Sequence, residues 1–193
     1  MARPVSFDRE EVLGRATRAF WERGYCATSV SDLVEATQLQ PGSLYAAFDS
    51  KQGLFLAVLD HYAQQTVGRL RQRLAEANDP LQGIEAFFNG LVAERADRRR
   101  RGCLLVNTVL EMGRTNSEVQ GRVARHFGEI ETALRNALER ARDDGVLADG
   151  RSPAVLAKFL MTTIWGLRVL GSTGASARDA GQVVTEALSV LRD

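Results

Sequence analysis

The stretch that decides the fold runs from Thr28 to Phe55 and reads TSVSDLVEATQLQPGSLYAAFDSKQGLF. Ser29 followed by Asp32 is a helix-capping signature. Pro41 suits the first position of a second helix, because its missing N–H costs nothing there. The residues between these signals, 37–40, are typical of a short turn. The stretch therefore predicts two short helices joined by a tight turn, which is a helix-turn-helix.

Helices are also predicted on both sides of this pair. A longer helix begins after Asp8 and ends at Gly24, and the pattern beyond Lys51 changes to long amphipathic helices. We expect these at 51–77, 80–97, 103–113, 117–144, 153–172 and 177–192. The sequence predicts an all-α protein with a three-helix N-terminal helix-turn-helix domain (1–50) and a C-terminal helical sensing and dimerisation domain (51–193).

Composition indicates a folded, soluble, cytoplasmic protein. The 193 residues are 45% hydrophobic and 25% charged, which is typical of globular domains. The N-terminus lacks the apolar segment of a signal peptide. Lys158 and Arg168 interrupt the most apolar window, 154–171, so we do not expect it to span a membrane. Two cysteines without an export signal favour reduced thiols in a cytosol.

Charge and motif content exclude several functions. The first sixty residues carry six basic against eight acidic side chains, so local motifs rather than a bulk basic patch must support DNA binding. His61 and His126 have no metal-ligand spacing with a cysteine, and nucleotide-binding motifs are missing. We therefore expect no metal, no cofactor and no enzyme activity. A helical enzyme stays as the alternative class, in which Glu111 and His126 would have to form a catalytic pair.

The helix-turn-helix segment resembles the DNA-binding signature of the TetR family of transcriptional repressors. The matching residues are Thr28, Gly42, Ser43, Leu44, Tyr45, Phe48, Ser50 and Lys51. This resemblance implies a homodimer that binds double-stranded operator DNA and leaves it when the C-terminal domain senses a signal. Ala46 departs from many relatives, which carry a histidine or an aromatic residue at this position or the next, so a base contact there is not carried over.

The chemistry of this segment agrees with DNA binding. Free N–H groups at a helix start favour a phosphate, and a glycine there allows close approach. Glutamine can read adenine, serine can serve a base edge or a phosphate, and tyrosine and lysine can hold phosphates. We expect Leu44 and Phe48 to face the core. The predicted DNA-contacting residues are Thr28, Ser29, Gln40, Pro41, Gly42, Ser43, Tyr45 and Lys51.

A second motif, RRRRGCLLVNTVLEMG, extends from Arg98 to Gly113. It resembles a TetR subgroup that responds to electrophiles such as N-ethylmaleimide. The resemblance implies that Cys103 is the sensor, with Asn107 and Glu111 on the same helical face. A helix start and four preceding arginines favour the thiolate of Cys103. The alternative is an inert, buried cysteine beside a solvated loop. Cys26 is expected to be a packing thiol.

Two apolar stripes on the last two helices predict a twofold dimer built as a four-helix bundle. The residues of the stripes are Val155, Phe159, Leu160, Thr163, Leu167 and Leu170, then Val183, Val184, Ala187, Leu188 and Leu191. The alternative is that both stripes pack only within their own domain. A second hypothesis for the signal is a reversible ligand in an apolar pocket. Its walls would be Phe87, Phe88, Leu110 and Trp165, unless these are core residues.

Overall fold

The computed structural model describes residues 7–97 and 102–192, and within these ranges it contains helices and no strands. The all-α prediction is therefore confirmed, and the observed helices match the expected ranges to within a few residues. Their bounds are α1 Arg9–Ala27, α2 Val30–Thr37, α3 Pro41–Phe48, α4 Lys51–Glu76, α5 Pro80–Asp97, α6 Leu104–Met112, α7 Ser117–Asp143, α8 Pro153–Ser172 and α9 Ala177–Ser189.

Side-chain caps fix the ends of the first helices. The Asp8 carboxylate accepts N–H bonds from Glu10 and Glu11 at the start of α1. Ser29 and Asp32 form the predicted reciprocal capping box at the start of α2. The turn that follows uses Gln38 in the left-handed conformation (φ 61°). Such caps satisfy N–H groups that a helix end leaves unpaired, so the local sequence sets these boundaries.

The connection from α3 to α4 is tight. Ser50 caps α4 by accepting an N–H bond from Gly53 at 2.9 Å. A Cβ atom at Gly53 would lie only 2.0 Å from the carbonyl oxygen of Phe48. Glycine is therefore required for α3 to approach the first turn of α4 this closely, and the connection fixes α3 against α4.

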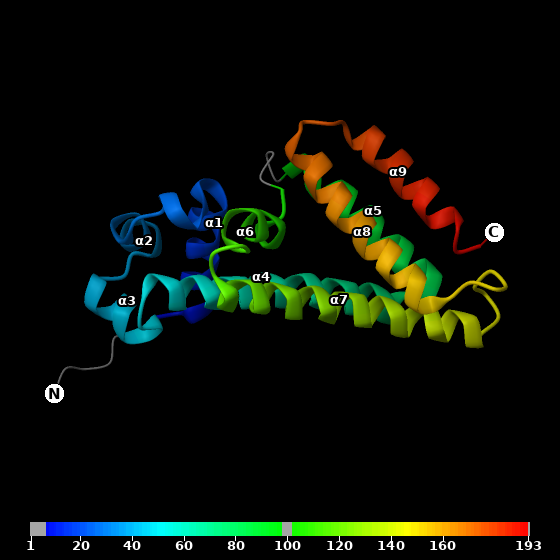
Figure 1. Cartoon of the computed structure of the whole chain (residues 1–193), viewed down its shortest axis with the longest axis horizontal. Coiled ribbons are helices and arrows are strands. Elements are labelled where there is room, and N and C mark those ends of the chain that lie inside the picture. The colour runs from blue at the N-terminus through cyan, green and yellow to red at the C-terminus, as the bar shows by residue number, and fades with distance from the viewer. Residues whose placement is uncertain (1–6, 98–101, 193) are drawn as a thin grey trace.

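Two hydrophobic clusters stabilise the molecule, and helix α4 contributes to both of them. Figure 1 shows α1 to α3 at one end, α5, α8 and α9 at the other, and α4 and α7 running side by side beneath both. The N-terminal cluster contains Phe20, Leu44 and Phe55, but also Cys103 on the way into α6 and Val119 in α7. The helix-turn-helix therefore shares its core with residues well beyond position 50.

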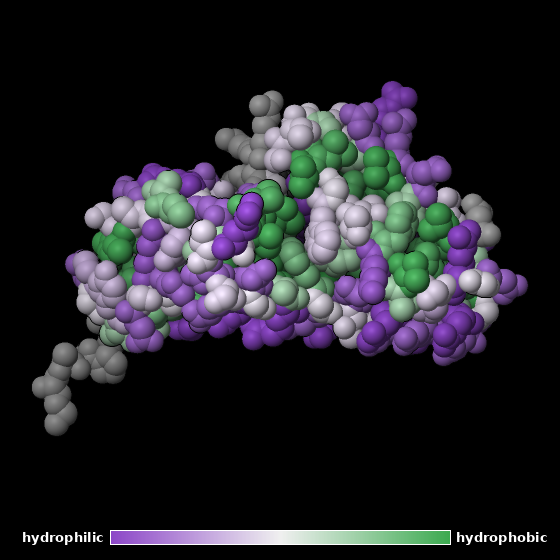
Figure 2. Space-filling model, in the orientation of Figure 1, coloured by the Kyte–Doolittle hydropathy of each residue, from purple (hydrophilic) through white to green (hydrophobic). Residues whose placement is uncertain are grey.

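The C-terminal cluster contains part of the predicted dimer stripes, so the residues in that part do not form a dimer surface. Leu160 and Leu167 of α8 are buried in the protomer's own core, as are Val184 and Leu191 of α9. Val155, Phe159 and Val183 of the same stripes are exposed, and so are Trp165 and Val169 of α8. Figure 2 shows hydrophobic surface gathered over α6 and along α8 and α9.

Helix α8 is long and apolar enough, by length and composition alone, to cross a membrane. Core helices of soluble proteins meet the same criterion, and α8 packs against α5, α6, α7 and α9. Lys158 and Arg168 also lie within it. Its apolar composition is therefore accounted for by packing on one face and by the exposed apolar residues on the other.

Candidate nucleic-acid interface and sensor helix

The start of α3 presents the predicted base-contacting residues. Gln40 is the N-cap residue and makes no side-chain cap bond, and Pro41 occupies the first turn. Gln40, Pro41 and Gly42 are exposed and Ser43 is half-buried, whereas Leu44 and Phe48 are buried in the core. A Cβ atom at Gly42 would meet no other atom within 4 Å. None of the described residues therefore covers this helix start, and another molecule can approach its backbone.

Tyr45 in α3 carries a hydroxyl group, and Lys51 at the start of α4 carries an ammonium group. The side chain of Tyr45 is 44% exposed. Lys51 is the first residue of α4, and its Nζ lies 4.4 Å from the centroid of the Tyr25 ring. A cation above an aromatic face is held by the ring quadrupole. Tyr25, which sequence reasoning passed over, therefore positions the ammonium group of Lys51.

Thr28, a predicted DNA-contacting residue, is not accessible to DNA. Its side chain is completely buried, and its hydroxyl donates to the carbonyl oxygen of Gly24 at 2.6 Å. Thr28 thus closes the last turn of α1 instead of facing a phosphate. The prediction rested on free N–H groups at a helix start, but Thr28 has no exposed surface from which an N–H group could reach a phosphate.

Ser29 is exposed but already serves the capping box. Its hydroxyl donates to Asp32 Oδ2 at 2.7 Å and accepts from the Asp32 N–H at 3.1 Å. The hydrogen bonds from Ser29, followed by the ion pair with Arg23, lower the pKa of Asp32 to about 2. Asp32 is therefore ionised at neutral pH and locks the start of α2.

The carboxylate of Glu111, one of the predicted sensor residues, contacts the end of α1. Its carboxylate accepts the backbone N–H of Tyr25 at 3.0 Å and that of Cys26 at 2.7 Å, which joins α6 to the end of α1. Gly24 makes room for it with φ 79° and ψ 172°, a conformation that only glycine adopts readily. The hydrogen bond to Glu111 also raises the pKa of the exposed Cys26 thiol.

Cys103 occupies the N-cap position of α6 and is 8% exposed. The Tyr62 hydroxyl, from α4, donates to its Sγ at 3.8 Å. Asn107, one turn further along α6, is exposed. The predicted sensor residues thus lie in three surroundings: Cys103 inside against α4, Asn107 at the surface, and Glu111 against α1. Residues 98–101, the predicted arginine run, lie outside the described residues.

An apolar groove lies between α6, α7 and α8. It has a volume of about 330 Å³, and Leu110, which is 77% exposed, forms part of its wall. The rings of Phe127 and Trp165 meet there with centroids 5.1 Å apart. Phe87 and Phe88 do not line it, because both are buried in the C-terminal cluster. Of the four predicted pocket residues, two therefore belong to the groove and two to the core.

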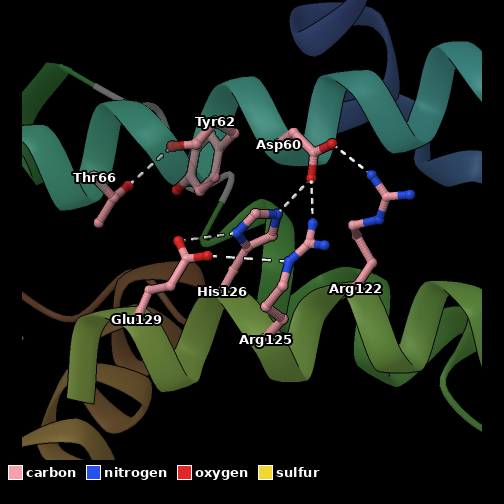
Figure 3. Close-up of polar contacts among 7 residues, drawn as sticks. All are labelled: Asp60, Tyr62, Thr66, Arg122, Arg125, His126 and Glu129. Carbon is pink, nitrogen blue, oxygen red and sulfur yellow. Dashed lines mark hydrogen bonds and ion pairs between the residues drawn. The ribbon is translucent and has the colours of Figure 1, made fainter. Parts of the chain in front are cut away.

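A polar cluster that local sequence patterns did not reveal joins α4 to α7 (Figure 3). Asp60 of α4 accepts from Arg122 at 2.5 Å and from Arg125 at 3.2 Å, and it pairs with His126 Nε2 at 2.7 Å. Glu129 lies 3.5 Å from the other ring nitrogen of His126. More than sixty residues separate the two sides of this cluster, which joins α4 to α7.

Two family models match the chain and together cover most of it. The model described as bacterial regulatory proteins of the tetR family matches residues 12–58. The model described as a tetracyclin repressor-like C-terminal domain matches residues 80–186. These two ranges correspond to the helix-turn-helix end and to the helices from α5 to α9.

Individual proteins are similar over nearly the whole chain. The HTH-type transcriptional repressor ComR of Escherichia coli (strain K12) is 29% identical over 183 residues, which are 94% of this chain and 87% of the relative. A structure of the TetR family regulator CifR, a cysteine mutant complexed with 26-bp operator DNA, is 34% identical with a TM-score of 0.87. It covers 98% of this chain and 100% of that one. The reduced form of E. coli NemR shares the fold at 19% identity, with a TM-score of 0.86 and coverage of 95% and 96%.

Proposed function

Since this chain belongs to the TetR family of bacterial regulatory proteins, we propose that it holds operator DNA at the starts of α3 and α4 and releases it when a signal alters α6. It is a DNA-binding transcriptional repressor and not an enzyme. Members of this family are dimers, so two copies would present two recognition helices to a duplex. Its relatives are soluble regulators, which supports a cytoplasmic location.

The observation that carries the DNA contact is the exposed start of α3, together with the ammonium group of Lys51 at the start of α4. Gln40 and Ser43 can reach base edges, and Tyr45 and Lys51 can hold phosphates on either side. The exposed Ser29 and the open backbone at Pro41 and Gly42 would add phosphate contacts. The buried Thr28 is left out. CifR, at 34% identity, has been solved with its operator DNA, which supports the same use of the fold here.

The chain offers a matched control for this contact because it contains only two lysines, Lys51 and Lys158. Lys51→Ala should weaken binding to a labelled duplex from the DNA flanking its own gene, and should lower the salt slope by about one per protomer. Lys158→Ala makes the same change in net charge on α8 and should bind like the wild type. Equal affinity and salt slope for Lys51→Ala and the wild type would refute the phosphate contact.

For the signal, we propose covalent modification of Cys103. Its thiol is enclosed against Tyr62, whose ring meets that of Trp21 from α1 at 5.3 Å. Because Cys103 is buried at the junction of these helices, an added group would have to displace α6 from α4. The competing thiol, Cys26, is exposed, but the hydrogen bond to Glu111 raises its pKa and so lowers its thiolate fraction.

The apolar groove favours a second candidate signal, a reversible ligand bound against Leu110 and Trp165. The two candidates differ in their response to N-ethylmaleimide. Under the cysteine mechanism, Cys103→Ser binds DNA but resists release, whereas Cys26→Ser is released like the wild type. If Cys103→Ser is released as readily as the wild type, modification of Cys103 is not the signal. Release of Cys103→Ser by a reversible apolar compound, blocked by Leu110→Glu, would then support the groove.

A further inference from the structure

One carboxylate links α6 to the DNA-facing lysine through backbone and ring contacts. Glu111 accepts the N–H groups of Tyr25 and Cys26, and the Tyr25 ring lies under the ammonium group of Lys51. We infer that Glu111 is a positioning residue for DNA binding, which sets the place of Lys51 through Tyr25. This inference rests on the proposed phosphate contact of Lys51.

The backbone at the end of α1 has N–H groups that need the acceptor atoms of Glu111. Gly24 leaves the helical conformation, so the residues after it are no longer held by the regular helix ladder. The carboxylate of Glu111 supplies acceptors for two of their N–H groups from a different helix. Without it, these two N–H groups lose their acceptors, and the wide range of backbone conformations open to Gly24 allows the segment after it to shift.

The ring of Tyr25 links the backbone position of Tyr25 to the position of the Lys51 ammonium group. It packs on Phe55, with centroids 4.9 Å apart, and on Phe20 at 6.1 Å. These contacts hold one side of the ring, while Lys51 occupies a face of it. A shift of the Tyr25 backbone would move the ring away from Lys51. The lysine would then sample more orientations and hold a phosphate less well.

Whether removal of Glu111 weakens or tightens DNA binding distinguishes a positioning role from simple charge repulsion. Removing a negative charge near a DNA-binding surface reduces repulsion of the phosphates and should tighten binding. Removing a positioning residue should weaken binding instead. Glu118 provides the control, since it is an exposed carboxylate on α7 that bonds Gln52, the neighbour of Lys51, at 2.7 Å. Glu118→Ala changes the net charge by the same amount without touching Tyr25.

The test is a double-mutant cycle in which fluorescence anisotropy measures binding to the same flanking duplex across a range of KCl concentrations. Glu111→Ala should weaken binding about tenfold for the dimer, because each protomer loses one cation–π restraint. In the Lys51→Ala background the same substitution should have almost no effect. Glu111→Gln keeps one hydrogen-bond acceptor and should lose less affinity for the duplex. It also replaces Glu111→Ala in the cycle if that variant does not fold.

The outcomes distinguish failure of the positioning role of Glu111 from failure of the phosphate contact of Lys51. Unchanged or tighter binding by Glu111→Ala, with Lys51→Ala weakened, overturns the positioning role and leaves the phosphate contact standing. An equal loss in both backgrounds also overturns it, because the effect would then not pass through Lys51. Wild-type binding by Lys51→Ala overturns the phosphate contact itself and the inference with it.

Discussion

Replacing Gly24 by alanine tests the joint between α1 and α6 directly. Gly24 has φ 79° and ψ 172°, a region in which side chains other than that of glycine are strained. A Cβ atom there would also lie 2.8 Å from Oε2 of Glu111. The substitution therefore combines backbone strain with displacement of the carboxylate that caps Tyr25 and Cys26.

Backbone strain dominates the expected size of the effect. A residue forced into this region costs about 1–3 kcal/mol. The carboxylate of Glu111 ends a flexible side chain and can move aside, so its displacement adds little to this. For a chain of this length, a cost of about 2 kcal/mol lowers Tm by about 4–8 °C.

Thermal unfolding followed by circular dichroism at a fixed protein concentration measures the change. Gly14→Ala is the matched control, because Gly14 lies within the same helix and an added Cβ meets no atom within 4 Å. Alanine at a helix interior should stabilise by about 0.5–1 kcal/mol, so the two variants should shift Tm in opposite directions. A Gly24→Ala protein that unfolds at the same temperature as the wild type would refute the strain argument. Combining it with Glu111→Ala should leave most of the loss in place.

Two further predictions concern assembly and acid stability. Phe159→Glu, on the exposed face of α8, should give monomers in sedimentation, whereas Val146→Glu, at similar exposure outside α8, should leave the dimer intact; a dimeric Phe159→Glu would exclude this face. Asp32→Asn should lower Tm at neutral pH. Because folding lowers the pKa of Asp32 from 3.8 to about 2, its stabilisation is complete above about pH 4 and is lost as the pH falls towards 2. The Tm difference between wild type and Asp32→Asn should therefore shrink over that range, and a constant difference would contradict the assignment.

The sequence predicted the helix ends that are fixed by contacts between residues close together in the chain. The capping box of Ser29 and Asp32 and the proline opening α3 depend on neighbours within a few residues, and both occur as expected. The contact of Glu111 with Tyr25 crosses 86 residues of chain and involves backbone N–H groups, which leave no signature in spacing. The polar cluster around Asp60 was missed because its two sides lie more than sixty residues apart in the chain.

The periodic pattern of apolar residues did not predict which face of α8 is buried in the protomer. Helix α8 is apolar on the face that packs into its own domain, at Leu160 and Leu167, and also on its exposed face, at Phe159 and Val169. A helix that is apolar on both sides offers little contrast between its faces, so its pattern does not say which side faces the protomer core. The three-dimensional arrangement was needed to separate the two faces.

The shared N-terminal cluster restricts how this regulator can be recombined. Phe55, Cys103 and Val119 complete the core of the helix-turn-helix from three segments beyond residue 50. A chimera cut after α3 would expose this apolar surface to water and invite aggregation. A transplant that keeps the DNA-binding end folded would have to carry the first half of α4, all of α6 and the start of α7, and so would bring the proposed sensor helix with it.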